Sequence, residues 1–251
     1  MGVVAGAIVP HAPVLSLEHH SDRLRTSVET VRSAVDSIDF GDCEVLVIAS
    51  PHGRAAGVYS GVSGSLHGFG VHRSVRASSD LGLAGELARR WGHPVLEPPV
   101  DHGVTGALLL AGRLTERPVV AATFAATTGP GAPGEFDVVA KEAEALADAI
   151  TLIATGRRIG FLASAHTSAA LSPAAPLLDR PDGHALEERV RAALESDLGE
   201  LTRIQPEMWR AAGACGAGPV ISFGALFAGR RADLLAYEAP AGVGYLVALG
   251  E

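Results

Sequence analysis

The segment Val3-Val4-Ala5-Gly6-Ala7-Ile8-Val9, followed at once by Pro10 and His11, gives the first indication of the fold. An uncharged run of small and β-branched residues that ends at a proline is typical of a buried β-strand. A helical pattern follows between residues 24 and 38, where apolar side chains recur at spacings of four, three, four and three. A buried strand followed by an amphipathic helix favours an α/β layer protein.

The same alternation continues to the end of the chain. Further strands are predicted at 44–49, 118–124, 159–163, 234–237 and 244–249, and further helices at 81–91, 104–114, 139–153, 186–198 and 201–209. Residues 57–66 could form a hairpin or a loop with a short strand, whereas three prolines predict that 168–182 is mostly loop. With no internal repeat or low-complexity linker, residues 1–251 are predicted to form one α/β domain, whose mostly parallel or mixed sheet has helices on both faces.

Composition excludes several classes of function. The 251 residues carry 20 Lys and Arg against 28 Asp and Glu, a net charge of −8, so we expect no binding to nucleic acid or to an anionic membrane. No apolar stretch approaches the roughly 18 residues that span a bilayer, and no basic targeting segment is present, which predicts a cytoplasmic protein. Ten histidines against two cysteines indicate that any metal would be bound by imidazole and carboxylate.

One glycine-rich segment matches the letter of a dinucleotide-binding motif. It is Gly129-Pro130-Gly131-Ala132-Pro133-Gly134, between a predicted strand and a predicted helix. A phosphate-binding turn needs free backbone N–H groups, which the two prolines lack, so we expect no nucleotide site here.

Three histidines follow the ends of predicted strands, namely His11, His52 and His166. Ligands of open α/β sheets gather beyond the carboxyl ends of the strands, so these imidazoles could converge, although each alone is more often a structural residue. Glu238 also ends a strand, where the alternative is a solvated turn residue. Two imidazoles and one carboxylate form the facial arrangement that holds non-haem Fe(II). The remaining candidate, His102, opens a helix after Asp101, whereas six histidines in polar or turn segments are expected to be solvated.

Five short motifs in order resemble those of the LigB superfamily, which comprises the catalytic subunits of class III extradiol dioxygenases and the Memo-like proteins. They are Ile8-Val-Pro-His11-Ala-Pro13, Ala49-Ser-Pro-His52-Gly53, Gly64-Ser-Leu-His-Gly-Phe-Gly70, Asp101-His-Gly-Val104 and Tyr237-Glu-Ala-Pro-Ala-Gly-Val-Gly-Tyr245. The resemblance covers nearly the whole chain and implies a single α/β domain that forms a homo-oligomer, with a small accessory subunit in some cases.

The resemblance also implies a set of site residues and substrates. His11, His52 and Glu238 would bind Fe(II), and the substrates would be an aromatic diol, such as a catechol, and O₂. His102 would transfer protons, with Asp101 orienting it. The aromatic residues Tyr59, Phe69 and Tyr245 lie within the matching motifs and are candidates for the substrate pocket.

The chain departs from the family at the second proton-transfer histidine. Ring-cleaving members have Gly-Gly-Leu-Ser-His after a strand, whereas this chain has Ser164-Ala-His166-Thr-Ser168-Ala169, so Ala169 aligns with the family histidine. We expect His166 to reach the same space and to act as the second acid–base group. The departure leaves open an alternative, a Memo-like metal-binding or redox protein without ring cleavage. A zinc hydrolase with the same ligands is disfavoured, because the chain lacks a clear third histidine or bridging aspartate motif.

Overall fold

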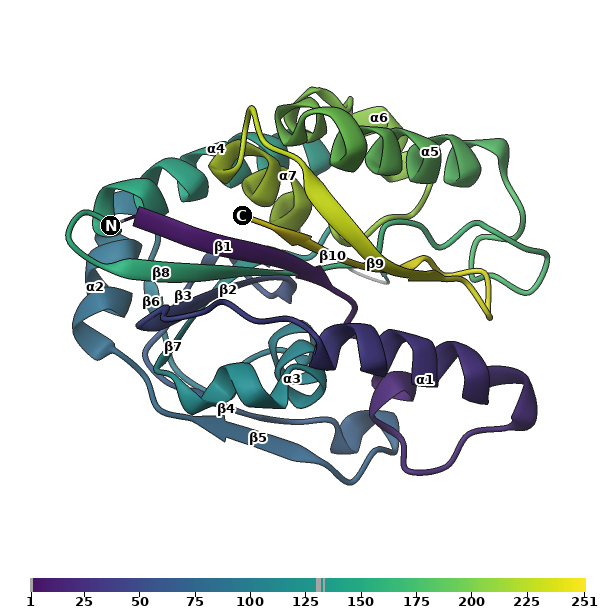
Figure 1. Cartoon of the computed structure of the whole chain (residues 1–251), viewed down its shortest axis with the longest axis horizontal. Helices are drawn as coiled ribbons and strands as arrows, with labels where there is room; N and C mark the ends of the chain where they lie inside the picture. The colour runs from purple at the N-terminus through teal and green to yellow at the C-terminus, as the bar shows by residue number, and fades with distance from the viewer. Residues whose placement is uncertain (1, 130–131, 133) are drawn as a thin grey trace.

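The computed structural model describes residues 2–129, 132 and 134–251, and its centre is an eight-stranded mixed sheet (Figure 1). Three parallel strands that run side by side form its middle, in the order β2-β8-β1. The strands of the sheet are β1 (Gly2–Val9), β2 (Val45–Gly53), β3 (Gly57–Tyr59), β6 (Val95–Leu96), β7 (Val119–Ala125), β8 (Arg158–Ser164), β9 (Ala232–Glu238) and β10 (Tyr245–Gly250). Their order across the sheet is β6-β3-β7-β2-β8-β1-β10-β9.

Helices cover both faces of this sheet. One face carries α1 (Asp22–Asp36) and α3 (His102–Leu110), and the small antiparallel pair β4 (Val62–Ser65) and β5 (Ser74–Ala77) lies beyond α3. The opposite face carries α2 (Leu81–Trp91), α4 (Phe136–Ile153), α5 (Pro181–Ser196), α6 (Pro206–Ala211) and α7 (Ala217–Leu226). The prediction of a single α/β domain with a mixed sheet between helices is confirmed.

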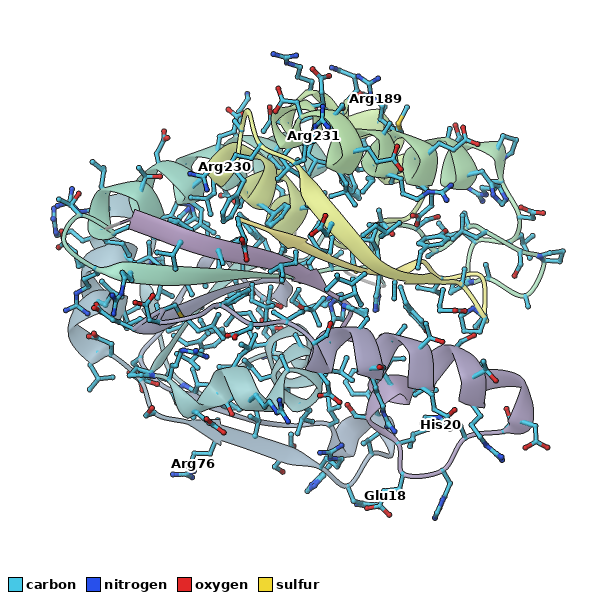
Figure 2. The ribbon with its side chains drawn as sticks, in the orientation of Figure 1. Glu18, His20, Arg76, Arg189, Arg230 and Arg231 are labelled. Carbon is cyan, nitrogen blue, oxygen red and sulfur yellow. The ribbon has the colours of Figure 1, made fainter. Side chains whose placement is uncertain are left out.

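The alternation of side chains along β2 explains the two layers. Val45, Val47 and Ala49 are buried in the core under α2, α4 and α7, whereas Leu46 and Ile48 are buried under α1 and α3. Successive side chains of a strand point to opposite faces, so a strand that is apolar throughout must be covered on both sides. Charged side chains such as Arg76, Arg189 and Arg230 extend away from the layers (Figure 2).

Most predicted elements are present, and the differences have local causes. The predicted helix at 201–209 is interrupted, because a 3-10 helix (Leu198–Arg203) ends before Pro206 starts α6. The helix predicted at 104–114 ends at Leu110 and is followed by a 3-10 helix (Gly112–Glu116). Residues 57–66 form no hairpin, since β3 pairs in the large sheet and β4 pairs with β5.

Helix α7 carries no sequence periodicity. Its residues from Ala217 to Gly224 are all buried, so apolar side chains occupy every side of the helix and no amphipathic stripe marks it. Among the described residues, no helix has both the length and the apolar character that crossing a bilayer requires. Pro130, Gly131 and Pro133 of the glycine- and proline-rich segment lie outside the described residues.

Candidate metal centre

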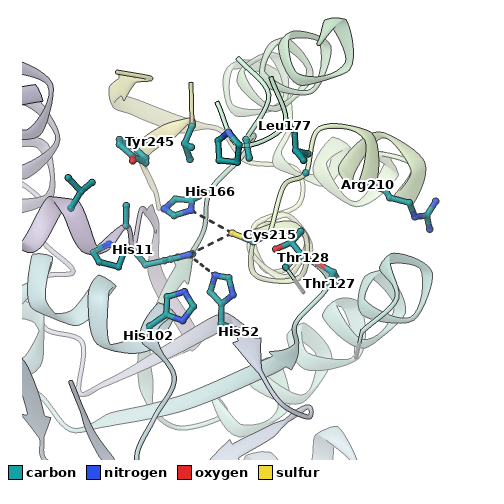
Figure 3. A pocket seen from close by; sticks show the side chains of 18 of the residues that line it. His11, His52, His102, Thr127, Thr128, His166, Leu177, Arg210, Cys215 and Tyr245 are labelled. Carbon is teal, nitrogen blue, oxygen red and sulfur yellow. Dashed lines mark hydrogen bonds between the residues drawn. The ribbon is translucent and has the colours of Figure 1, made fainter. Parts of the chain in front are cut away.

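Histidines from separate parts of the chain meet at the carboxyl ends of the central strands. His11 follows β1, His52 is the second-last residue of β2, and His166 follows β8, so the order β2-β8-β1 brings them together. The ring centroids of His11 lie 4.8 Å from His52, 4.0 Å from His166 and 5.8 Å from His102 (Figure 3). The other six histidines belong to neither group of potential metal ligands among the described residues.

The hydrogen bonds around His11 fix its tautomer. The hydroxyl of Ser164 donates its single proton to the carbonyl of Gly103 at 2.8 Å. Nδ1 of His11 lies 2.8 Å from the same hydroxyl oxygen, so it must carry a proton and donate it. In a neutral imidazole this leaves the lone pair on Nε2, the atom that faces the rest of the cluster. Such an outer hydrogen bond is what orients histidine ligands of metals.

His11 and His52 present their Nε2 atoms to each other. The two atoms are 2.9 Å apart, and the rings are nearly perpendicular, at 88°. Two imidazoles bound to one ion at about 2.0–2.1 Å each place their nitrogens about 3 Å apart when they occupy adjacent positions. The pair therefore has the spacing that one shared metal ion requires.

His102 and His166 stack on this pair. The ring of His102 lies 4.0 Å from that of His52 at 30°, and the ring of His166 lies 4.0 Å from that of His11 at 33°. The lone pair of an imidazole lies in the ring plane, so two nearly parallel rings cannot both direct lone pairs at one ion. Although the donor atoms of His11, His52 and His102 all lie within 4.8 Å of one another, the stacking favours His102 and His166 as flanking groups.

Cys215, which precedes α7, also belongs to the cluster. Its Sγ is 3.7 Å from Nε2 of His11 and 3.7 Å from Nδ1 of His166, and the side chain is buried. Sequence reasoning missed this residue because a single cysteine outside any motif carries no spacing. The sequence offered one indication, which is that small residues surround Cys215. In the structure the adjacent Gly216 packs closely, since a Cβ there would collide with Ala165 and the His166 carbonyl.

Asp101 supports the site through the start of α3. Its Oδ1 accepts hydrogen bonds from Ser50 Oγ and from the backbone N–H groups of Gly103 and Val104, and its Oδ2 accepts one from Thr123 Oγ1. The carboxylate therefore caps the helix and ties it to β2 and β7. Asp101 positions His102, the first residue of α3, by fixing the helix rather than by a hydrogen bond to its ring.

Helix α3 approaches the strands closely because two of its residues are glycines. A Cβ on Gly103 would collide with Ser50 Oγ, and a Cβ on Gly106 would collide with the backbone of His11. These two positions set the distance between α3 and the ends of β1 and β2.

The imidazoles are uncharged at neutral pH. Burial, together with the nearby His166, His52 and His102, holds the pKa of His11 far below its usual value. Burial lowers the pKa of His52 to about 2 and that of His166 to about 3, with His102 contributing to both. Burial also lowers the pKa of His102, against the opposing effect of Asp101. Neutral imidazole is the form that binds metals, so the cluster is ready to accept a cation without losing protons.

The cluster forms the floor of a cavity of about 660 Å³. Its walls are mainly apolar and include Phe136, Leu177, Val243 and Tyr245 (Figure 3). Tyr245 lies 5.5 Å from His166 between ring centroids, and burial raises its pKa. This volume lies within the usual range for small-molecule sites, about 300–1,000 Å³.

The other predicted pocket residues lie around the cluster. Tyr59 lines a second cavity of about 510 Å³, which His52 and Asp101 also line. Phe69 lies 4.8 Å from His102 between ring centroids and is 55% exposed, but it lines neither cavity.

Glu238 is not brought into the cluster. It is the last residue of edge strand β9 and pairs with Tyr245 of β10. Within the described part of the chain, neither group of three donor atoms lying within 4.8 Å of one another includes its carboxylate, and it does not line the cavity. The donor atoms that could hold a metal are nitrogen and sulfur, in two groups that share His11: His11 with His52 and His102, and His11 with His166 and Cys215.

Comparison with known proteins supports the fold alone. No family model matches the chain, and no curated protein sequence matches it. Among solved structures, the crystal structure of the uncharacterized protein JW3007 from Escherichia coli K12 is similar, with a TM-score of 0.62 and 15% sequence identity. The similarity covers 98% of this chain and 99% of that chain, so the same architecture extends over both molecules.

Proposed function

We propose that the protein is a non-haem Fe(II)-dependent dioxygenase of the extradiol type, which opens the ring of a catechol or a related hydroxylated aromatic. The observation that carries the proposal is the perpendicular pair His11 and His52, with Nε2 atoms 2.9 Å apart, at the floor of an apolar cavity. The ordered motifs that resemble the LigB superfamily give the proposal its reaction class.

The donor set fits a divalent transition metal. His11 offers Nε2 with its lone pair, because Nδ1 donates to Ser164, and His52 faces it. Imidazole nitrogen is a preferred ligand of Fe(II), Zn(II) and Cu(II). The proposal retains Glu238 as the predicted carboxylate ligand and requires it to approach His11 and His52 when iron binds.

The residues of this chain would bind the diol and move its protons. A bound Fe(II) supplies the redox chemistry with O₂ and lowers the pKa of the diol hydroxyls. In this proposal His102 and His166, which stack on the two ligands, take protons from the diol and return them to the opened product. One ring C–C bond breaks and both atoms of O₂ enter the product, so no external reductant is needed. The apolar walls would keep bulk water away from this chemistry.

The proposal is tested with protein reconstituted anaerobically with Fe(II) and then given O₂ and a series of diols. Catechol, protocatechuate, gallate and alkylcatechols are screened for yellow ring-fission products. We expect His11→Ala and His52→Ala to lose iron, whereas His102→Ala keeps iron and loses turnover by about a hundredfold or more. His184→Ala is the matched control, since His184 is exposed and, in the described part of the chain, its ring forms a hydrogen bond with Asp179 away from the cluster. Failure to bind iron, or no ring-fission product from any diol, would contradict the proposal.

A second candidate function is favoured by Cys215. A thiol within reach of His11 and His166, in a cluster without a carboxylate, suits a Memo-like metal-binding or redox protein that does not cleave rings. Thiolate is a soft ligand and binds copper and zinc well, whereas the iron of the first candidate is bound by imidazole and carboxylate.

Metal affinity of two variants distinguishes the candidates. If the protein is a dioxygenase, Glu238→Gln weakens Fe(II) binding and Cys215→Ser leaves it nearly unchanged. If the protein is Memo-like, Cys215→Ser weakens binding of copper or zinc and Glu238→Gln has no effect. Calorimetric titration of each variant with each metal gives the answer, and ring fission that depends on His102 would exclude the second candidate.

A further inference from the structure

The cavity above the histidines is far larger than a catechol ring requires, and its walls indicate what else it holds. Its volume is about 660 Å³, a size that suits a ligand of drug-like dimensions. Beyond the four histidines the walls are formed mainly by apolar side chains, among them Val14, Phe136, Pro176, Leu177 and Val243. A bare diol would leave most of this apolar surface in contact with water.

The cavity has little to offer an anionic substituent. Arg210 is the one lysine or arginine among the described lining residues, and its guanidinium lies 3.3 Å from Asp137 and 5.6 Å from the Phe136 ring. Figure 3 shows this side chain directed away from the histidines. A carboxylate on the side of the ring away from His11 and His52 would therefore lose its hydration without gaining a cationic partner.

From these two observations we propose that the substrate is an uncharged aromatic diol carrying a bulky apolar substituent, and not a carboxylated diol. The diol end lies at His11 and His52, and the substituent lies along Leu177, Ala169 and Val243. This inference rests on the proposed function for the diol, whereas the preference for an uncharged apolar group rests on the cavity walls alone.

Ala169 is the position from which the proposal can be probed. It lines the cavity, and its backbone N–H donates to the Ala212 carbonyl while its own carbonyl accepts from the Leu177 N–H. A larger side chain at residue 169 therefore enters the space next to Leu177 while the backbone bonds remain. The exposed Val138 of α4 is 50% accessible and serves as the control position.

The experiment measures binding to Fe(II)-loaded protein by calorimetry without O₂, and the ligands are catechol, 4-ethylcatechol, 4-butylcatechol and protocatechuate. We expect affinity to rise about three- to fourfold for each added methylene, as burial of about 0.8 kcal/mol per CH₂ implies. Protocatechuate should bind at least about tenfold more weakly than 4-ethylcatechol, because its carboxylate is desolvated. Ala169→Leu should lower the affinity for 4-butylcatechol by about tenfold and change the affinity for catechol by less than about twofold, since overpacking affects only the substituent. Val138→Ala should change neither affinity.

Dimethyl ethers of the same alkylcatechols separate this inference from the proposed function, because they cannot chelate iron. If the affinity of the ethers for metal-free protein rises with chain length and no diol undergoes ring fission, the apolar site is supported and the dioxygenase is contradicted. Flat affinity across the alkyl series, or protocatechuate binding as tightly as 4-ethylcatechol, would overturn the inference even if ring fission occurs. Loss of tight protocatechuate binding in Arg210→Gln would then identify Arg210 as an anion-binding residue.

Discussion

At the scale of single residues, Ser164 is the residue that prepares His11 for a metal. Its hydroxyl donates to Gly103 and accepts from Nδ1 of His11, which directs the lone pair of Nε2 into the cluster. The histidines at the strand ends could be predicted from sequence because each follows an apolar strand. The roles of Ser164 and Cys215 could not, since hydrogen-bond direction and the approach of α7 depend on the packed structure.

Ser164→Ala removes the hydrogen bond that fixes the His11 tautomer. We expect Fe(II) affinity to fall about 10- to 100-fold, the usual effect of losing an outer partner of a histidine ligand. The matched control is Ser222→Ala, since Ser222 is also fully buried and donates to a backbone carbonyl, that of Ala143, away from the cluster. Both variants should lose similar stability, but only Ser164→Ala should lose metal affinity. Equal metal affinity in the two variants would show that the tautomer does not matter.

Glu187 makes stability depend on pH. It is 2% exposed, its Oε1 accepts a hydrogen bond from Thr167 at 2.6 Å, and its Oε2 has no partner among the described residues. Burial raises its pKa from 4.5 to about 7. Because the pKa is higher in the folded than in the unfolded state, Glu187 contributes fully to the free energy of unfolding when the pH is below the unfolded-state pKa. This contribution is lost as pH rises through about 7.

The free energy of unfolding of Glu187→Gln should therefore equal that of the wild type below about pH 4. Above about pH 8 it should be higher, by on the order of 3 kcal/mol. Urea denaturation of the metal-free proteins at both pH values measures the difference. A stability difference that does not grow with pH would contradict a raised pKa at Glu187.

At the scale of elements, α3 is the piece that brings His102 to the strand ends. The sequence predicted this helix over residues 104–114, with His102 opening it after Asp101, but did not identify Asp101 as the residue that caps it. It did not predict how closely the helix packs, which depends on Gly103 and Gly106 facing β1 and β2. Helix α7 escaped prediction for a related reason, because complete burial removes the periodicity that marks amphipathic helices.

Gly106→Ala tests the close approach of α3. The added methyl group would meet the backbone of His11, so we expect a loss of about 1–3 kcal/mol in stability and weaker Fe(II) binding. Gly85→Ala in α2 is the control, because a Cβ there meets nothing within 4 Å. Replacing a helical glycine by alanine in open space should stabilise the protein by about 0.5–1 kcal/mol. Thermal unfolding measures the first effect and metal titration the second; unchanged stability in Gly106→Ala would contradict the proposed packing.

At the scale of the whole molecule, the sequence was sufficient for the architecture but not for the full ligand set. The order β2-β8-β1 brings together His11, His52 and His166 from three separate parts of the chain, as the rule for strand ends predicts. Glu238 ends a strand too, but β9 is the edge strand beyond β10, so its carboxylate lies outside the cluster. The positions of His11, His52 and His166 after strands predicted that they lie at the same edge of the sheet. The sequence could not show how far along that edge Glu238 lies from them.

Anomalous diffraction at the iron edge, from crystals grown with Fe(II) in the absence of O₂, tests the metal centre itself. We expect one ion bound by Nε2 of His11, Nε2 of His52 and the carboxylate of Glu238 at about 2.0–2.2 Å. His102 and His166 should flank the ion without binding it, because they stack on the two ligands. An ion bound elsewhere, or no ion at His11 and His52 at saturating Fe(II), would contradict the metal centre.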